Sequence, residues 1–111
     1  MNASTADIVL NFRRELTFRT GSDTRKGEVH IDRLSFLAER HCWGCYWSLS
    51  FVRPRSDQPI FGEDALQAFT LTLSLISSLL RNPGTPGLQI WWLSEGDNGG
   101  FPVQLADILA V

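Results

Sequence analysis

The sequence predicts an α+β domain in which one long helix packs across one face of an antiparallel β-sheet. One segment, 62–81, has apolar residues at helical spacing, and three earlier segments alternate apolar and polar residues as strands do. A fourth short apolar segment follows the helix, so the predicted element order is β-β-β-α-β. The chain has 111 residues, of which 43% are hydrophobic, and we expect a single domain over 1–111.

The helix is the strongest of these predictions. Its ten apolar residues cover more than half of the circumference, and no charged residue stands between Asp64 and Arg81. We expect Glu63 and Asp64 in the first turn and Arg81 in the last turn, where their charges oppose the helix dipole. Segment 82–84, Asn-Pro-Gly, then ends the helix. Because the apolar arc is so wide, we expect a nearly enclosed helix that is covered from a second side as well.

The first two strands are expected to form a hairpin. Residues 7–19 alternate, with one apolar face made of Ile8, Leu10, Phe12, Leu16 and Phe18. The polar segment 21–27 is framed by glycines and predicts a loop. Alternation resumes over 28–38 and changes phase near Asp32 and Arg33, which predicts a β-bulge.

A third strand, a linker and a fourth strand complete the predicted sheet. The third strand has one apolar face made of Trp43, Cys45, Trp47, Leu49 and Phe51, and a linker with two prolines, 53–59, leads from it to the helix. Segment 88–93 is apolar on both faces, which predicts a strand in a covered position, paired with either the first or the third strand. After an acidic loop, 94–100, a short C-terminal helix is predicted for 101–110 with Pro102 at its first position.

Charge and composition exclude several classes of function. The net charge is −2, which gives no electrostatic basis for binding nucleic acid or an anionic membrane. The first 55 residues carry a net charge of +3 and the remainder −5, an asymmetry that the fold is expected to mix. No apolar segment predicts a signal peptide or a membrane span, and the two cysteines fit a reducing compartment, so we expect a cytoplasmic protein.

The sequence contains fragments of catalytic and metal-binding motifs, each with a simpler explanation. Cys42 and Cys45 form a C-x-x-C, but at the start of a strand the two side chains point to opposite faces. Zinc needs further ligands, and only His30 and His41 are available. We therefore expect Cys45 to be a core residue, and we predict no redox or metal site.

The remaining fragments also favour structural roles. The carboxylates of Glu63 and Asp64 are explained by the helix dipole rather than by acid–base catalysis. Glu95, Asp97 and Asn98 lack the spacing and closing glutamate of a calcium loop. The glycines at 96–100 lack the lysine of a phosphate loop. We predict neither a catalytic residue nor a bound cofactor.

Tryptophan is the most unusual feature, with four residues in a short chain. Trp91 and Trp92 are adjacent in a predicted strand, so they are expected to face opposite sides of the sheet. An outward tryptophan is either covered by the terminal segment or anchors an interface. As candidate interaction residues we select Trp47, Trp91, Trp92, Glu95 and Asp97.

Four short motifs resemble a family of small bacterial domains of unknown function. They are the Trp43-Gly44-Cys45-Tyr46 strand, the helix start Gly62-Glu63-Asp64-Ala65-Leu66-Gln67-Ala68, the Trp91-Trp92-Leu93 strand and the segment Gly100-Phe101-Pro102. The resemblance covers residues 43–102, and Cys42 has no counterpart in it. It implies a fold and does not imply an activity.

We therefore expect a non-enzymatic protein–protein interaction module. Small acidic α+β proteins of this kind include immunity proteins that neutralise a cognate toxin, and that partner class is our hypothesis by analogy. The alternative is a small-molecule-binding domain that uses the open sheet face, with Trp47 or Trp91 as a wall. Self-association as a homodimer is compatible with either function.

Overall fold

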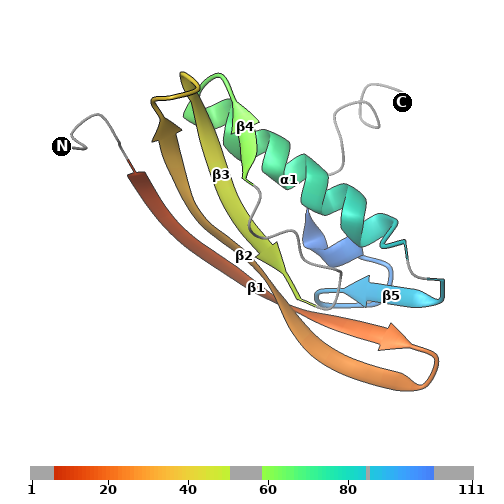
Figure 1. The fold of residues 1–111 in the computed structure, drawn as a ribbon. Coiled ribbons are helices and arrows are strands. Elements are labelled where there is room, and N and C mark those ends of the chain that lie inside the picture. The colour runs from red at the N-terminus through yellow and green to blue at the C-terminus, as the bar shows by residue number, and fades with distance from the viewer. Residues whose placement is uncertain (1–6, 51–58, 85, 102–111) are drawn as a thin grey trace.

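A computed structural model of the chain describes residues 7–50, 59–84 and 86–101. The elements, in chain order, are β1 (Asp7–Thr20), β2 (Asp23–Leu37), β3 (Cys42–Leu49), β4 (Ile60–Gly62), α1 (Ala65–Arg81), β5 (Leu88–Trp91) and the 3₁₀ helix η1 (Asn98–Gly100). The five strands form one antiparallel sheet in the order β4-β3-β2-β1-β5. The sheet curls around α1, which lies on its concave face (Figure 1).

The α+β class is confirmed, but the predicted element order is wrong because it omits β4. This strand has three residues and pairs with the start of β3, with Trp43 opposite Gly62. Gly62 is buried, and a Cβ atom at this position would lie 2.3 Å from the backbone nitrogen of Ala68. Only glycine therefore allows the edge strand and the helix start to approach this closely.

The predicted loop at 21–27 is also wrong, because β2 begins at Asp23. Thr20 pairs with Asp23, so Gly21 and Ser22 alone form the turn, and Gly21 has a φ of 61°. Residues 23–26 are exposed. This part of the strand lacks the apolar alternation that identifies a half-buried strand, because neither of its faces meets the core.

The predicted β-bulge in the second strand is confirmed. The register between β2 and β3 shifts between Ile31 and Arg33. The shift leaves Asp32 and Arg33 both on the outer face and returns Leu34 to the core. β1 carries a second irregularity, between Val9 and Phe12, where Asn11 adopts a φ of 51°.

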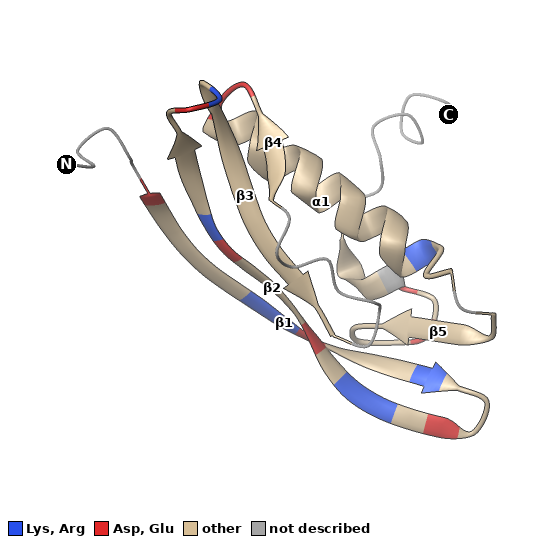
Figure 2. Cartoon of the chain, viewed as in Figure 1, with Lys and Arg blue, Asp and Glu red and all other residues tan. Residues whose placement is uncertain are grey.

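The helix extends to Arg81 as predicted, but it begins at Ala65, so Asp64 is its N-cap rather than a first-turn residue. The Asp64 carboxylate accepts a hydrogen bond from the Gln67 N–H at 2.7 Å, and the Gln67 side chain accepts one from the Glu63 N–H at 2.6 Å. This reciprocal pair resembles a capping box, except that the Gln67 side chain accepts from the residue before the N-cap rather than from the N-cap itself. Except at Arg81, the helix carries no charge, whereas charges gather on β1 and β2 (Figure 2).

One side of α1 contributes to a single core between the helix and the sheet. The buried hydrophobic residues are Leu16, Phe18, Val29, Ile31, Leu34, Cys45, Trp47, Leu49, Ala68, Ile76, Leu80 and Ile90. The expectation of a nearly enclosed helix is wrong for the described part of the chain, where Leu66 is 70% exposed and Leu71 is 45% exposed. The predicted residue Phe51 and the predicted C-terminal helix from Pro102 onward lie outside the described residues.

The last strand, β5, is shorter than predicted and lies at the sheet edge rather than in a covered position. It pairs with β1 alone, from Thr17 opposite Trp91 to Thr20 opposite Leu88. Ile90 is buried, while Leu88 and Trp91 are half-buried. No helix of the described part of the chain is long and apolar enough to cross a membrane.

Candidate functional site

The C-x-x-C does not bring two thiols together. Cys45 is completely buried and faces the helix, where burial raises the pKa of its thiol against the opposing effect of a hydrogen bond with Thr72. Cys42 is half-buried, and both cysteines are free. Alternation along β3 directs the two side chains to opposite faces. Within residues 7–50, 59–84 and 86–101, no three His, Cys, Asp or Glu residues gather as they would at a metal site.

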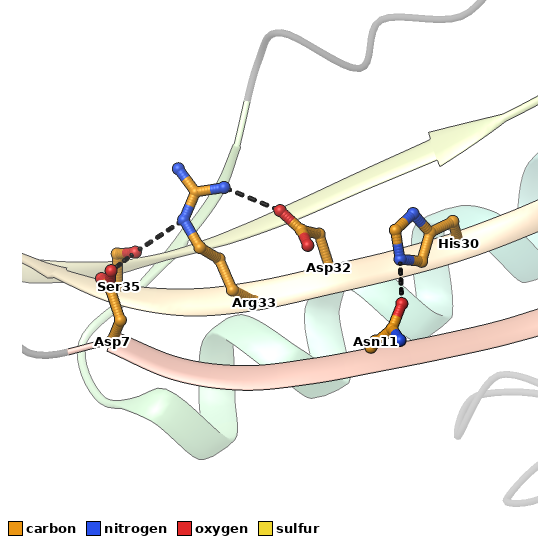
Figure 3. A network of polar contacts seen from close by, with 6 residues as sticks. All are labelled: Asp7, Asn11, His30, Asp32, Arg33 and Ser35. Carbon is orange, nitrogen blue, oxygen red and sulfur yellow. Dashed lines mark hydrogen bonds and ion pairs between the residues drawn. The ribbon is translucent and has the colours of Figure 1, made fainter.

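The outer face of the sheet carries a polar network (Figure 3). Arg33 donates to the Asp32 carboxylate at 2.8 Å and to the Ser35 hydroxyl at 3.2 Å, and Ser35 donates to Asp7 at 2.6 Å. The guanidinium of Arg33 also lies 3.9 Å from the ring centroid of Tyr46. These contacts span β1, β2 and β3 at the bulge of β2, so they hold the irregular register in place.

His30 belongs to the same face. Its Nε2 lies 2.9 Å from the Asn11 side-chain oxygen, which also accepts a hydrogen bond from Arg13 Nε at 3.2 Å. An amide oxygen is only an acceptor, so His30 Nε2 is the donor in this hydrogen bond. The pair connects the irregularity of β1 to β2. It has a structural role, and no nucleophile accompanies it among these contacts.

The predicted interaction residues fall into separate places. Trp47 is 4% exposed and belongs to the core, so little of its ring is accessible to a partner. Trp91 lies on the outer face beneath Arg19, whose guanidinium is 5.0 Å from the ring centroid. Glu95 accepts from the same arginine at 2.5 Å. Trp92 is 37% exposed and lies past the end of β5.

Asp97 organises the turn that follows β5 rather than presenting its carboxylate outward. One oxygen accepts from the backbone N–H groups of Trp92 and Gly99, and the other from those of Leu93 and Ser94, at 2.7–3.0 Å. Desolvation raises the pKa of Asp97, but the backbone hydrogen bonds outweigh it and lower the pKa to about 2. The carboxylate thereby ends the strand, because it takes the N–H of Leu93, which alternation from the Thr17–Trp91 pair would otherwise direct toward β1.

An apolar groove lies between β1 and the helix. Its volume is 340 Å³. Its apolar lining consists of Phe12 of β1, Val29 and Ile31 of β2, Phe69 and Leu73 of α1, and Phe101, and its other lining residues are Arg13, Arg14 and Gly100. We call this feature the β1–α1 groove. Phe12 meets Phe69 edge to face at 6.1 Å between ring centroids, yet Phe12 is 51% exposed. Leu66, which is 70% exposed, lies one turn before Phe69 on the same side of the helix.

Arg14 stands at one end of the β1–α1 groove. Its guanidinium stacks on Trp92 at 3.7 Å and lies 5.1 Å from the Phe101 ring centroid. Its Nη1 donates to the carbonyl oxygens of Gly99 at 3.2 Å and Gly100 at 3.0 Å. Two rings and two carbonyls therefore fix a positive charge beside an apolar space.

The first half of β1 borders the groove and forms a free sheet edge in the described structure, since β5 covers only Thr17–Thr20 (Figure 1). The Glu28 carbonyl accepts from the Ser50 N–H, so Val29 directs its backbone groups toward its β1 partner Arg14. By alternation, the backbone N–H and C=O groups of Arg13 and Glu15 point away from β2, along the free edge.

Sequence reasoning missed this groove. It assigned Phe12 and Leu66 to the core because both lie on apolar faces, and it did not select Arg14. The one signal in the sequence was the width of the helix's apolar arc, which exceeds what a single sheet face covers. We interpreted that excess as burial, whereas part of it lines the groove.

No curated protein and no solved structure matches the chain. A family model described as a domain of unknown function (DUF6968) matches residues 12–103. This range includes every residue that lines the β1–α1 groove. This agrees with the expectation of an uncharacterised domain family, and it extends the matched region beyond the motifs at 43–102. The chain therefore belongs to the DUF6968 family.

Proposed function

We propose that this domain is a non-catalytic protein-binding module that takes an extended apolar segment of a partner protein into the β1–α1 groove. The observation that carries the proposal is the juxtaposition of an open apolar groove with a strand edge that is unpaired among the described residues. Phe12, which lines the groove, exposes 51% of its surface, and Leu66, one helical turn before the lining residue Phe69, exposes 70%. Exposed apolar surface next to unpaired backbone groups is the arrangement that strand addition uses.

The partner's backbone would pair with the outward groups of Arg13 and Glu15, and its side chains would enter the groove. Backbone pairing gives affinity in this mode of recognition, and the pocket gives specificity. The irregularity at Asn11 restricts regular pairing to the part of β1 between Phe12 and Leu16. A short segment of about five residues fits this length.

A cognate toxin is the partner class that we propose by analogy with small immunity proteins. This narrower proposal has its own test, which is protection of cells that express a toxin encoded beside the domain. Survival that requires the domain and is lost in Leu66→Ser would support it. Survival that Leu66→Ser does not affect would show that the domain does not use the groove to neutralise the toxin.

A small-molecule site on the helix-free face is the second candidate. It is supported by a hollow of 330 Å³ lined by His30, Asp32, Arg33, Tyr46, Trp47 and Ser48. The charges there are already paired, with Asp32 and Arg33 at 2.8 Å, and Trp47 is buried. A ligand would have to displace these contacts, so we rank this function below protein binding.

Panning a phage-displayed library of random decapeptides on the purified domain tests the main proposal. We expect enriched peptides whose binding is lost in Phe12→Ser and Leu66→Ser. The matched control is Leu71→Ser, since Leu71 is also an exposed helix leucine, at 45%, but lies on another side of the helix. Peptides that bind all three variants equally, or no enrichment at all, would refute groove binding.

The light-scattering mass of the domain tests the competing occupant, a second copy of the chain. We expect a monomer. A dimer that Phe12→Ser or Leu66→Ser dissociates would show that the groove is filled by self-association, and it would overturn the proposal. The same measurement in Leu71→Ser controls for a general change in solubility.

A further inference from the structure

We propose that Arg14 selects a partner segment in which an acidic residue stands two positions from a large apolar residue. This inference rests on the proposed function and names the chemistry of the segment. The acidic side chain pairs with the Arg14 guanidinium, while the apolar side chain fills the β1–α1 groove beside Phe12 and Phe69.

The first step concerns the charge of Arg14. Four other arginines pair with carboxylates within 4 Å: Arg13 with Glu28, Arg19 with Glu95, Arg25 with Asp23, and Arg33 with Asp32. Arg14 pairs with no carboxylate in the described ranges 7–50, 59–84 and 86–101. Its Nη1 reaches two backbone carbonyls, and its remaining N–H groups have no partner in those ranges. A half-buried guanidinium in this state retains donors for an added carboxylate.

The second step concerns rigidity. Stacking on Trp92 at 3.7 Å and donation to Gly99 and Gly100 hold the guanidinium in one place. The glycines are suited to this role, since a Cβ atom on Gly100 would lie 2.2 Å from the Trp92 ring. An arginine that is already ordered loses less entropy when it binds a carboxylate, and its planar donors favour that group.

The third step gives the spacing. Phe12 and Arg14 are two residues apart and face the same side of β1, as do alternate residues of any strand. Residues of an added strand that lie opposite them are likewise two apart on one face. A carboxylate opposite Arg14 and an apolar side chain opposite Phe12 therefore belong to a segment with one residue between them.

The surrounding chemistry favours both members of this pair. Apart from Arg14, and Arg13 whose guanidinium pairs with Glu28, the groove lining carries no charged side chain, so a carboxylate placed elsewhere along it would lose hydration without a partner. Charge-assisted hydrogen bonds to arginine are stronger than neutral ones, particularly where solvent is partly excluded. Arg14 thus sets both the position and the sign of the charge that the segment carries.

Panning the same decapeptide library on the wild-type domain, Arg14→Gln and Arg25→Gln tests this inference. Wild-type selections should be enriched in Asp or Glu two positions from an aromatic or large aliphatic residue. Arg14→Gln selections should keep the apolar residue and lose the acidic one. Arg25→Gln is the matched control, because Arg25 lies in the exposed hairpin, where it pairs with Asp23, and does not line the groove; its selections should keep both.

Calorimetry on one peptide selected by the wild-type domain gives a second readout, and its first measurement uses the wild-type domain alone. Replacing the peptide's acidic residue by its amide should weaken binding to the wild-type domain roughly tenfold, the loss of one charge-assisted contact. The same replacement should change binding to Arg14→Gln less than about twofold, as expected when the interacting group is already absent.

The possible failures are distinguishable. Groove-dependent peptides that show no acidic preference on the wild-type domain would overturn the role of Arg14 and leave the proposed function standing. An acidic preference that persists in Arg14→Gln would also overturn it. The absence of any peptide whose binding depends on Phe12 and Leu66 would overturn the proposed function, and this inference with it.

Discussion

Replacing Asp97 by asparagine should destabilise the domain at neutral pH and remove part of its pH dependence. Each carboxylate oxygen accepts two backbone N–H groups. An amide keeps one acceptor oxygen and places its NH₂ group against the other pair of donors. The turn after β5 therefore loses two hydrogen bonds and gains a donor–donor conflict.

The pKa of Asp97 gives the magnitude. A carboxyl whose pKa falls from 3.8 to about 2 on folding stabilises the fold at neutral pH by at most about 2.4 kcal/mol. Solvent screens this partly exposed turn, and we therefore expect about 1 kcal/mol. Because the folded pKa lies below the unfolded value, the contribution is complete well above pH 4. It falls to about half near pH 3 and vanishes below pH 2.

Urea denaturation of the wild-type domain and Asp97→Asn, at pH values from 7 to 2.5, measures this contribution. The variant should be about 1 kcal/mol less stable at pH 7, and the difference should shrink as the pH falls. Glu39→Gln is the control, since Glu39 is exposed in a turn and changes the net charge equally. Equal stabilities at pH 7, or a difference that does not change with pH, would refute the assignment of Asp97 as the residue that ends β5.

Three further predictions concern the packing of the fold. Gly62→Ala should destabilise the domain by about 1–3 kcal/mol in urea denaturation, because the added Cβ meets the Ala68 backbone; an unchanged midpoint would contradict this contact. Asp64→Ala should cost about 1 kcal/mol as a lost N-cap, measured in the same way, whereas Asp23→Ala in the exposed hairpin should cost much less. In native buffer, a thiol reagent should modify Cys42 well before Cys45, which burial and a raised pKa protect; equal rates, followed by mass spectrometry, would contradict the burial of Cys45.

The parts of the fold that were predictable from the sequence depend on local periodicity. The alternation over β1 and β3 and the helical spacing over α1 each reflect a repeated contact with one core. The bulge at Asp32 was also predictable, because an extra residue reverses the phase of the apolar positions that follow it. These signals depend only on near neighbours in the chain.

The parts that were missed depend on contacts between distant residues. The function of Gly62 depends on a helix backbone that crosses it, and β4 is too short to show alternation. The hairpin tip near Asp23 is strand because its backbone pairs, although its side chains are all solvated. The end of β5 at Trp91 follows from Asp97, six residues later, and the sequence shows only an acidic loop there.

The candidate site was missed for a related reason. Tryptophan attracted attention because it is rare, yet Trp47 is a core residue and Trp91 lies beneath Arg19. The groove is formed instead by ordinary residues such as Phe12 and Phe69, and the sequence does not reveal which of the many apolar side chains remain exposed in the fold. Arg14 becomes notable only when its neighbours Trp92 and Gly100, far along the chain, are placed around it.

The contact between Gly62 and Ala68 has a mechanical consequence for the whole domain. It clamps the first turns of α1 against the β4 edge of the sheet with no room between the two backbones, while the opposite flank of the helix faces the groove. The start of the helix is thus fixed against β4, and the distance between its other side and β1 sets the width of the groove. A side chain at position 62 would displace the start of the helix. A substitution that does not touch the groove would therefore change its width without changing any residue that lines it.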